Sequence, residues 1–230
     1  MAVGCRIKKN IVRPDRSLVE AFRGIPVANI DDCMNRLSAV QAELCPMNSS
    51  PLLGTAFTVK CPAGDNLMFH KALDLAQPGD VLVIAAGGSM SRALCGEIMA
   101  TYARSRGIAG FIIDGCVRDR DELAQFTDFP VYAKGVIPNG PYKNGPGEIN
   151  VPIACGGVSV NPGDIILADP DGVIVIPRKD APVILEDARK FQAADETKLA
   201  AAKDGTAKRG WVEKSLEEKG YEIIDSVYQP

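Results

Sequence analysis

Residues 96–119 read GEIMATYARSRGIAGFIIDGCVRD, a stretch in which one helix leads into one buried strand. Apolar residues recur at helical spacing over 98–103, and Gly107 is a typical helix end. The apolar run 109–113 is long enough for a buried strand, and Asp114-Gly115 predicts a turn after it. The stretch therefore predicts an α/β layer, and the rest of the chain is organised around it.

Charged residues stand at both ends of this stretch. Glu97 begins the predicted helix, and Arg118 and Asp119 follow the predicted strand. Helix starts and strand carboxyl ends share one edge of an open α/β layer, so these residues can face one pocket. Two carboxylates suit a hard cation such as Mg²⁺, and a guanidinium beside the free N–H groups of Ile98 and Met99 suits a carboxylate. An exposed turn with an Arg–Asp surface pair is the structural alternative.

The spacing of these charges resembles a known signature. An acidic residue, twenty intervening residues and Arg-Asp are typical of the metal-dependent (class II) 4-hydroxy-4-methyl-2-oxoglutarate / 4-carboxy-4-hydroxy-2-oxoadipate aldolases, which share a family with the regulator of ribonuclease activity A. Segments 62–84 (PAGDNLMFHKALDLAQPGDVLVI), 160–177 (VNPGDIILADPDGVIVIP) and 210–224 (GWVEKSLEEKGYEII) resemble the same family. The resemblance covers roughly residues 15–225.

The resemblance implies roles for individual residues. Asp119 would bind Mg²⁺ or Mn²⁺ directly, and Arg118 would hold the carboxylate and the C2 oxygen of a pyruvyl group. Glu97 stands where the family usually has Asp, and it would reach the metal through water. Contacts with the substrate are implied for further residues of the helix start and of an earlier segment: Gly96, Ile98, Met99, Asn66 and His70.

The resemblance also implies a fold and an assembly. The fold would be a three-layer β/β/α sandwich with a helical C-terminal tail, in one domain spanning residues 1–230. The assembly would be a homotrimer or a hexamer, with the helices of 180–224 at the subunit interface. Glu196, or Asp195 beside it, would reach the metal of a neighbouring subunit through water.

Composition excludes several classes of protein. The chain has 230 residues, 46% of them hydrophobic and 24% charged, which is ordinary for a globular domain with a sizeable core. A net charge of −3 gives no reason to expect nucleic acid or an anionic membrane as a partner. No long uncharged apolar run and no secretory signal are present, so we expect a cytoplasmic protein.

The seven cysteines do not indicate a disulfide framework or a zinc site. Their number is odd and none forms a C-x-x-C pair. Cys95 and Cys116 flank the predicted site, but a catalytic thiol needs a nearby base and His70 is the only histidine. His70 lies one turn after Asn66, which leaves a packed core histidine and a side chain beside the site as open readings.

The remaining elements follow from periodicity and turn residues. An irregular arm is expected for 1–14 and loops for 41–53, 87–91 and 136–150. Helices are expected over 17–23, 26–37, 65–76, 119–126, 180–203 and 211–219. Strands are expected over 54–61, 81–86, 131–135, 151–154, 157–160, 164–168 and 173–177. A βαβ-rich first half, a β-rich second half and a helical tail result.

The function that the resemblance implies is aldol cleavage of a 4-hydroxy-2-oxo acid to pyruvate, in the catabolism of aromatic compounds, with oxaloacetate decarboxylation as a side activity. A lysine Schiff base at Lys60, Lys71 or Lys134 is the rival aldolase chemistry. A non-catalytic regulator that binds a ribonuclease is the alternative from a different class. A methyltransferase has little support, because the chain lacks a glycine-rich cofactor loop.

Overall fold

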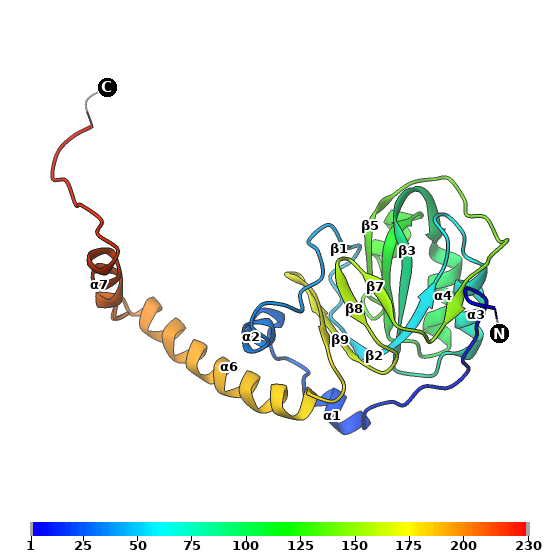
Figure 1. The fold of residues 1–230 in the computed structure, drawn as a ribbon, viewed down its shortest axis with the longest axis horizontal. Coiled ribbons are helices and arrows are strands. Elements are labelled where there is room, and N and C mark those ends of the chain that lie inside the picture. The colour runs from blue at the N-terminus through cyan, green and yellow to red at the C-terminus, as the bar shows by residue number, and fades with distance from the viewer. Residues whose placement is uncertain (1, 229–230) are drawn as a thin grey trace. The chain divides into compact units, whose positions relative to one another are not determined.

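The chain forms an α/β sandwich around one large mixed sheet, and the computed structural model describes residues 2–228 (Figure 1). The sheet has the strand order β1-β5-β4-β3-β2-β9-β10, and β6 also pairs with β2. Its centre is parallel: β2 (Leu52–Lys60), β3 (Asp80–Cys95), β4 (Gly110–Val117) and β5 (Val131–Val136) run in one direction. Every residue of β4 is buried, as expected for a parallel strand covered on both faces.

Antiparallel strands complete the edges of the sheet. β9 (Ile165–Asp169) pairs with β2 and β10 (Gly172–Ile176) pairs with β9, while β1 (Cys45–Pro46) lies against β5. β6 (Glu148–Ile149) pairs with the end of β2. The close strand spacing in the second half of the sequence therefore predicted the antiparallel part correctly.

Three layers can be followed in Figure 1. Helices α3 (Leu67–Leu75) and α4 (Glu97–Ser105) cover one face of the sheet, and the hairpin of β7 (Ile153–Cys155) and β8 (Val158–Val160) covers the other. Phe69 of α3, Phe111 of β4 and Phe129 form a row of edge-on aromatic contacts with centroids 4.9 Å apart in the helical layer. The expected β/β/α sandwich is confirmed.

The remaining helices are α1 (Arg16–Glu20), α2 (Val27–Cys33), α5 (Arg120–Ala124), α6 (Ala181–Lys203) and α7 (Gly210–Glu218). α1, α2 and the first turns of α6 bury apolar residues against β9 and β10. No helix among the described residues is both long and apolar enough to cross a membrane.

The chain divides into two compact units, and the boundary lies inside α6. The first unit ends at Arg189 and the second begins at Lys190. Ala181, Leu185 and Ala188 are buried at helical spacing in the first part of α6, whereas α7 has no buried residue. The sequence predicted one domain with C-terminal helices over 180–224, and the part of these helices from Lys190 onward belongs to the second unit.

Two predicted turns are wrong. Residues 87–91 were expected to be a loop, but β3 runs on to Cys95 with register shifts, and Ser89, Ala93 and Cys95 pair with β4. Asp114-Gly115 was expected to end its strand, yet β4 continues to Val117. Asp114 can lie inside a strand because it has a partner on β5. Lys134 Nζ lies 2.8 Å from Asp114 Oδ1, so the carboxylate is paired with a positive charge inside the sheet.

The N-terminal arm is irregular, as expected, but it is bound to the sheet. Ile7 forms a bridge with Ile149, and the side-chain amide of Asn150 donates to the carbonyl of Lys8 at 2.7 Å. Arg6 forms an ion pair with the buried carboxylate of Glu148. These contacts attach the arm to β6, which directly follows the 136–147 loop.

Candidate functional site

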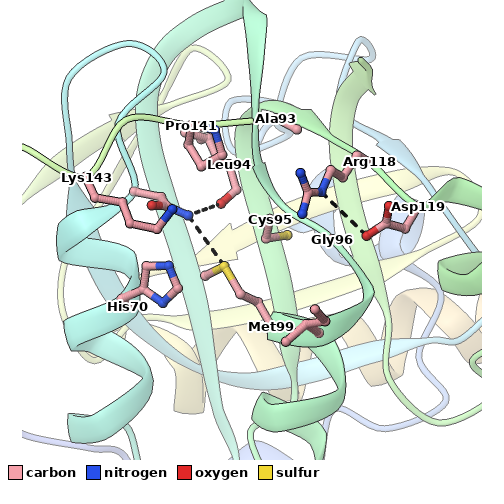
Figure 2. A pocket seen from close by; sticks show the side chains of 12 residues that line it. His70, Ala93, Leu94, Cys95, Gly96, Met99, Arg118, Asp119, Pro141 and Lys143 are labelled. Carbon is pink, nitrogen blue, oxygen red and sulfur yellow. Dashed lines mark hydrogen bonds and ion pairs between the residues drawn. The ribbon is translucent and has the colours of Figure 1, made fainter. Parts of the chain in front are cut away.

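A small cavity lies at the edge of the sheet where β3 and β4 end. Its volume is about 170 Å³, smaller than the ~300–1,000 Å³ of clefts that hold drug-sized ligands. Side chains from α3, α4, both strand ends and the 136–147 loop surround it (Figure 2). The residues that line it are Asn66, His70, Ala93, Leu94, Cys95, Gly96, Ile98, Met99, Arg118, Asp119, Pro141 and Lys143. A cavity of this size suits a small organic acid.

Strand register explains how the two ends of the 96–119 stretch meet. Cys95, the last residue of β3, pairs directly with Val117, the last residue of β4. The chain leaves β3 through Gly96 into α4 and leaves β4 through Arg118 into Asp119. The N–H of Arg118 donates to the carbonyl of Cys95 at 3.0 Å, which fixes the two exits side by side.

Asp119 is held in an uncommon backbone conformation. Its φ of 58° and ψ of 49° place it in the left-handed region, which few residues other than Gly, Asn and Asp adopt. Its Oδ2 accepts the N–H of Glu97 at 3.0 Å and lies 3.6 Å from Arg118 Nε. The carboxylate is therefore oriented by the start of α4 and by a guanidinium, and it remains partly exposed.

Gly96 allows this close approach. A Cβ at this position would overlap Asp119 Oδ2 and would lie 2.9 Å from Arg118 Cγ. The φ of Gly96 is −151°, so the backbone conformation suits any residue and the requirement for glycine is purely steric.

The structure brings most of the residues predicted for the site together. Arg118, Asp119, Gly96, Ile98, Met99, Asn66 and His70 all line the cavity. Glu97 does not: its side chain is exposed, and it meets Asp119 through its backbone N–H. Glu196 is exposed on α6 in the second unit, and neighbouring Asp195 forms an ion pair with Lys198 at 2.9 Å. The metal-related roles of Glu97 and Glu196 stay predictions.

Pro141 and Lys143 are cavity residues that sequence reasoning missed. The only signal in the sequence was a long Gly- and Pro-rich loop at 136–150. Asp65 Oδ2 accepts the N–H groups of Asn144 at 2.6 Å and Gly145 at 3.0 Å, which holds the loop over the cavity. Arg92 also contacts this loop, because its guanidinium carbon Cζ lies 4.0 Å from the centroid of the Tyr142 ring.

His70 is neutral at neutral pH. Burial lowers its pKa from the ordinary value of 6.5, the positive charge of Lys143 lowers it further, and Asp74 acts in the opposite direction. The imidazole can therefore donate through one nitrogen and accept through the other.

We expect Lys143→Met to raise the pKa of His70, because the substitution removes a cation that opposes protonation. The pKa should stay below 6.5, since burial is the larger cause. The chain has one histidine, so a proton NMR titration follows a single imidazole signal. Lys71→Met, on the same helix but outside this cavity, is the control. An unchanged titration midpoint in Lys143→Met would show that the two groups do not interact.

The two cysteines that flank the site are not thiolates. Burial is the main cause that raises the pKa of Cys95, and the charge of Asp119 raises it further. Burial also raises the pKa of Cys116, whose Sγ lies 3.5 Å from Met90 Sδ. A protonated thiol is a weak nucleophile, so this geometry gives no support to thiolate catalysis.

The residues around the cavity suit a metal ion that keeps most of its water ligands. Asp119 supplies a single carboxylate, and within residues 2–228 no three His, Cys, Asp or Glu side chains are grouped to hold an ion. A zinc cage needs three or four such ligands, whereas Mg²⁺ is often bound by one or two carboxylates and keeps several waters. Asp119 therefore fits Mg²⁺ or Mn²⁺ held mainly by water.

Comparison with known proteins identifies relatives of this chain in sequence and in fold. A protein of Halalkalibacterium halodurans, named provisionally a 4-hydroxy-4-methyl-2-oxoglutarate aldolase, is 40% identical over 200 residues, which are 86% of this chain and 95% of that one. A solved structure of an uncharacterised Pseudomonas syringae protein shares the fold, with a TM-score of 0.76 and 22% identity over 85% of this chain and 92% of that one.

A second solved structure is the RNA-processing inhibitor RraA from Thermus thermophilis. It matches with a TM-score of 0.61 and 31% identity over 66% of this chain and 92% of that chain. The model of the RraA-like family, described as Aldolase/RraA, matches residues 27–175. That range contains α3, α4, β3, β4 and all twelve residues of the cavity. The chain belongs to the RraA-like (Aldolase/RraA) family.

Proposed function

We propose that the protein is a divalent-metal-dependent aldolase. It would cleave 4-hydroxy-2-oxo acids such as 4-hydroxy-4-methyl-2-oxoglutarate or 4-carboxy-4-hydroxy-2-oxoadipate to pyruvate and a second oxo acid. The observation that carries the proposal is the placement of Arg118 and Asp119 against the start of α4 in a cavity sized for a small acid. The provisional name of the Halalkalibacterium relative supports it.

The cavity residues have separate tasks in this reaction. When the C3–C4 bond breaks, its electron pair stays on C3 as the enolate of pyruvate, and the C4 hydroxyl loses its proton to become the new carbonyl. Arg118 donates hydrogen bonds to the C2 oxygen, where negative charge develops, and the first-turn N–H groups of Ile98 and Met99 hold the C1 carboxylate. Asp119 would hold Mg²⁺ or Mn²⁺, which supplies Lewis-acid polarisation of the C2 carbonyl when bound.

Oxaloacetate decarboxylation follows from the same arrangement. Loss of CO₂ from oxaloacetate also leaves the enolate of pyruvate, so the same groups stabilise it. The proton of the C4 hydroxyl would leave through water. A homotrimer or a hexamer, in which Glu196 of a second copy faces this cavity, is part of the proposal.

The first test measures pyruvate release from oxaloacetate and from 4-hydroxy-4-methyl-2-oxoglutarate, with Mg²⁺ and then with excess EDTA. We expect both substrates to release pyruvate. EDTA should abolish this release, and added Mg²⁺ or Mn²⁺ should restore it. Release that persists in EDTA would favour Schiff-base chemistry. Lys143 would then be the candidate for the lysine that forms the Schiff base, because it lines the cavity. Lys60, Lys71 and Lys134 do not line it. Borohydride trapping with pyruvate would identify it.

Arg118→Lys should lower kcat/KM for both substrates about ten- to a hundredfold, because an ammonium group cannot donate the paired hydrogen bonds of a guanidinium. Arg120→Lys is the matched control, since Arg120 lies two residues further on α5 and outside the cavity. Near-normal kinetics in Arg118→Lys would remove Arg118 from the proposed role.

Regulation of a ribonuclease by protein contact is the second candidate, favoured by the similarity to the Thermus inhibitor. The two proposals differ in what they need from Arg118 and Asp119. An inhibitor that acts by surface contact does not need a metal or pyruvate release. Absence of release from both substrates, with and without metal, would favour this candidate or a different oxo acid.

A further inference from the structure

Arg92 binds the 136–147 loop with its guanidinium group. It lies on β3, immediately before the first residue of that strand to line the cavity, and its side chain is half-buried. Nη1 donates to the carbonyl of Gly140 at 2.7 Å, and Nη2 donates to the phenol oxygen of Tyr142 at 2.8 Å. The guanidinium also lies over the ring of Tyr142. Both ends of this group are therefore bonded to one segment of one loop.

The backbone around Gly140 is attached on both sides without the help of Arg92. On one side, the N–H of Ala93 donates to the carbonyl of Asn139 at 2.8 Å. On the other side, the N–H and the carbonyl of Tyr142 form hydrogen bonds of 2.8 and 3.0 Å with the segment that precedes α3. The loop would therefore stay in place without the Arg92 side chain, whereas the direction of the Gly140 carbonyl depends on it.

Arg118 lies beside Gly140 and is not bonded to it. A Cβ built on Gly140 would lie 3.5 Å from Arg118 Nη1, so the two residues are neighbours. Within residues 2–228 the Arg118 guanidinium donates no hydrogen bond, and its closest acid is Asp119, 3.6 Å from Nε. In Figure 2 the dashed line from Arg118 runs to Asp119. The donors of Arg118 are therefore available for a ligand.

The direction of the Gly140 carbonyl determines whether Arg118 remains available. A charged donor forms a stronger hydrogen bond with a carbonyl than a neutral donor does, so Arg118 would bind this carbonyl if it pointed toward Nη1. The bond from Arg92 directs the carbonyl toward β3 instead. A guanidinium that is already bonded to the protein has to break that bond before it can hold an anion, which weakens binding.

We propose that Arg92 is a positioning residue for the reaction. It holds the Gly140 carbonyl away from Arg118, and the Arg118 guanidinium thus stays free for the substrate. Arg92 does not line the cavity and does not touch the substrate, so it acts only through Gly140 and Arg118. The inference rests on the proposed function, in which Arg118 donates hydrogen bonds to the C2 oxygen.

The kinetic test is a double-mutant cycle with oxaloacetate as the substrate. Arg92→Met should lower kcat/KM about tenfold, because Arg118 then binds the Gly140 carbonyl in competition with the substrate. In Arg118→Met no donor remains to be captured, so the addition of Arg92→Met should change kcat/KM less than about twofold. A loss of equal size in both backgrounds, or normal kinetics in Arg92→Met, would overturn the proposal.

Arg104→Met is the matched control. Arg104 also donates two hydrogen bonds, to Asp128, and its guanidinium also lies over an aromatic ring, that of Phe126, but it is outside the cavity. We expect kcat/KM within about twofold of the wild-type value, since an exposed ion pair contributes little. A tenfold loss in this variant would show that Arg92→Met measures only the loss of a positive charge, and the proposal would fail.

A crystal structure of Arg92→Met separates this inference from the proposed function, because it requires no turnover. We expect Arg118 Nη1 within about 3.2 Å of the Gly140 oxygen. Arg92→Gln has the same expectation and is the second variant, since its amide is shorter than the guanidinium arm. An Arg118 that still donates to no residue of the loop would overturn the inference. If the wild-type protein releases no pyruvate, the new bond would support the control of Arg118 by Arg92, and only the aldolase proposal would fail.

Discussion

Asp119→Ala is expected to lower metal-dependent pyruvate release about a thousandfold or more, because it removes the one carboxylate that lines the cavity among the described residues. The loss has two parts. The variant cannot hold a divalent cation, and Arg118 loses the neighbour that lies 3.6 Å from its Nε. Steady-state release of pyruvate from oxaloacetate at several Mg²⁺ concentrations measures the effect.

Asp119→Asn is the control that separates charge from backbone strain. Asparagine tolerates the left-handed conformation at φ 58°, and its side-chain oxygen can still accept the N–H of Glu97. We expect an unchanged melting temperature and a loss of activity close to that of the alanine variant. Full turnover in both variants would show that Asp119 holds no metal.

Gly96→Ala is expected to lower kcat about a hundredfold or more while the fold persists. The added methyl group would overlap the Asp119 carboxylate and crowd Arg118, and both side chains can move because their ends are partly exposed. The substitution therefore displaces the two groups on which the reaction depends. The backbone at Gly96 accepts alanine, so circular dichroism and the melting temperature should change little.

Gly140→Ala is the matched control, at the residue that precedes Pro141 of the cavity. A Cβ there would lie 3.5 Å from Arg118 Nη1, which is ordinary van der Waals contact, and Gly140 has no positive φ. We expect near-normal turnover. If Gly96→Ala were as active as Gly140→Ala, the contact between Gly96 and Asp119 would have no catalytic importance.

Local pattern was enough to predict the framework. The helical spacing over 98–103 and the apolar run 109–113 predicted α4 and most of β4, and turn residues separated the strands of the second half correctly. Arg118 and Asp119 could be predicted because the residues that determine their position, the ends of β3 and β4, are close in sequence. Periodicity reports which face of an element is buried, and that requires only neighbouring residues.

Pairing across the sheet could not be predicted in the same way. Asp114-Gly115 has the chemistry of a turn, but Lys134 on β5 pairs with the Asp114 carboxylate inside the strand. The glycines at 87 and 88 indicate a loop, but β4 supplies partners that extend β3 to Cys95. Turn chemistry is a local preference, and long-range strand pairing can override it.

The residues of the sequence by themselves predicted the α/β elements and the charged end of the candidate site, and the three layers were predicted from the resemblance to a family. Only the tertiary structure placed Lys143 at the opposite end of the cavity. Asp65, 78 residues earlier in the chain than Lys143, accepts the N–H groups of Asn144 and Gly145 and so holds the loop that carries Lys143. It also decided that Asn66 Oδ1 is buried without a hydrogen-bond donor among the described residues, while Asp65 Oδ1 accepts the N–H of Leu67 at the start of α3. The spacing of residues in the sequence predicts contacts within one helix or strand. Whether a buried atom has a hydrogen-bond partner can be seen only when the positions of all its neighbours are known.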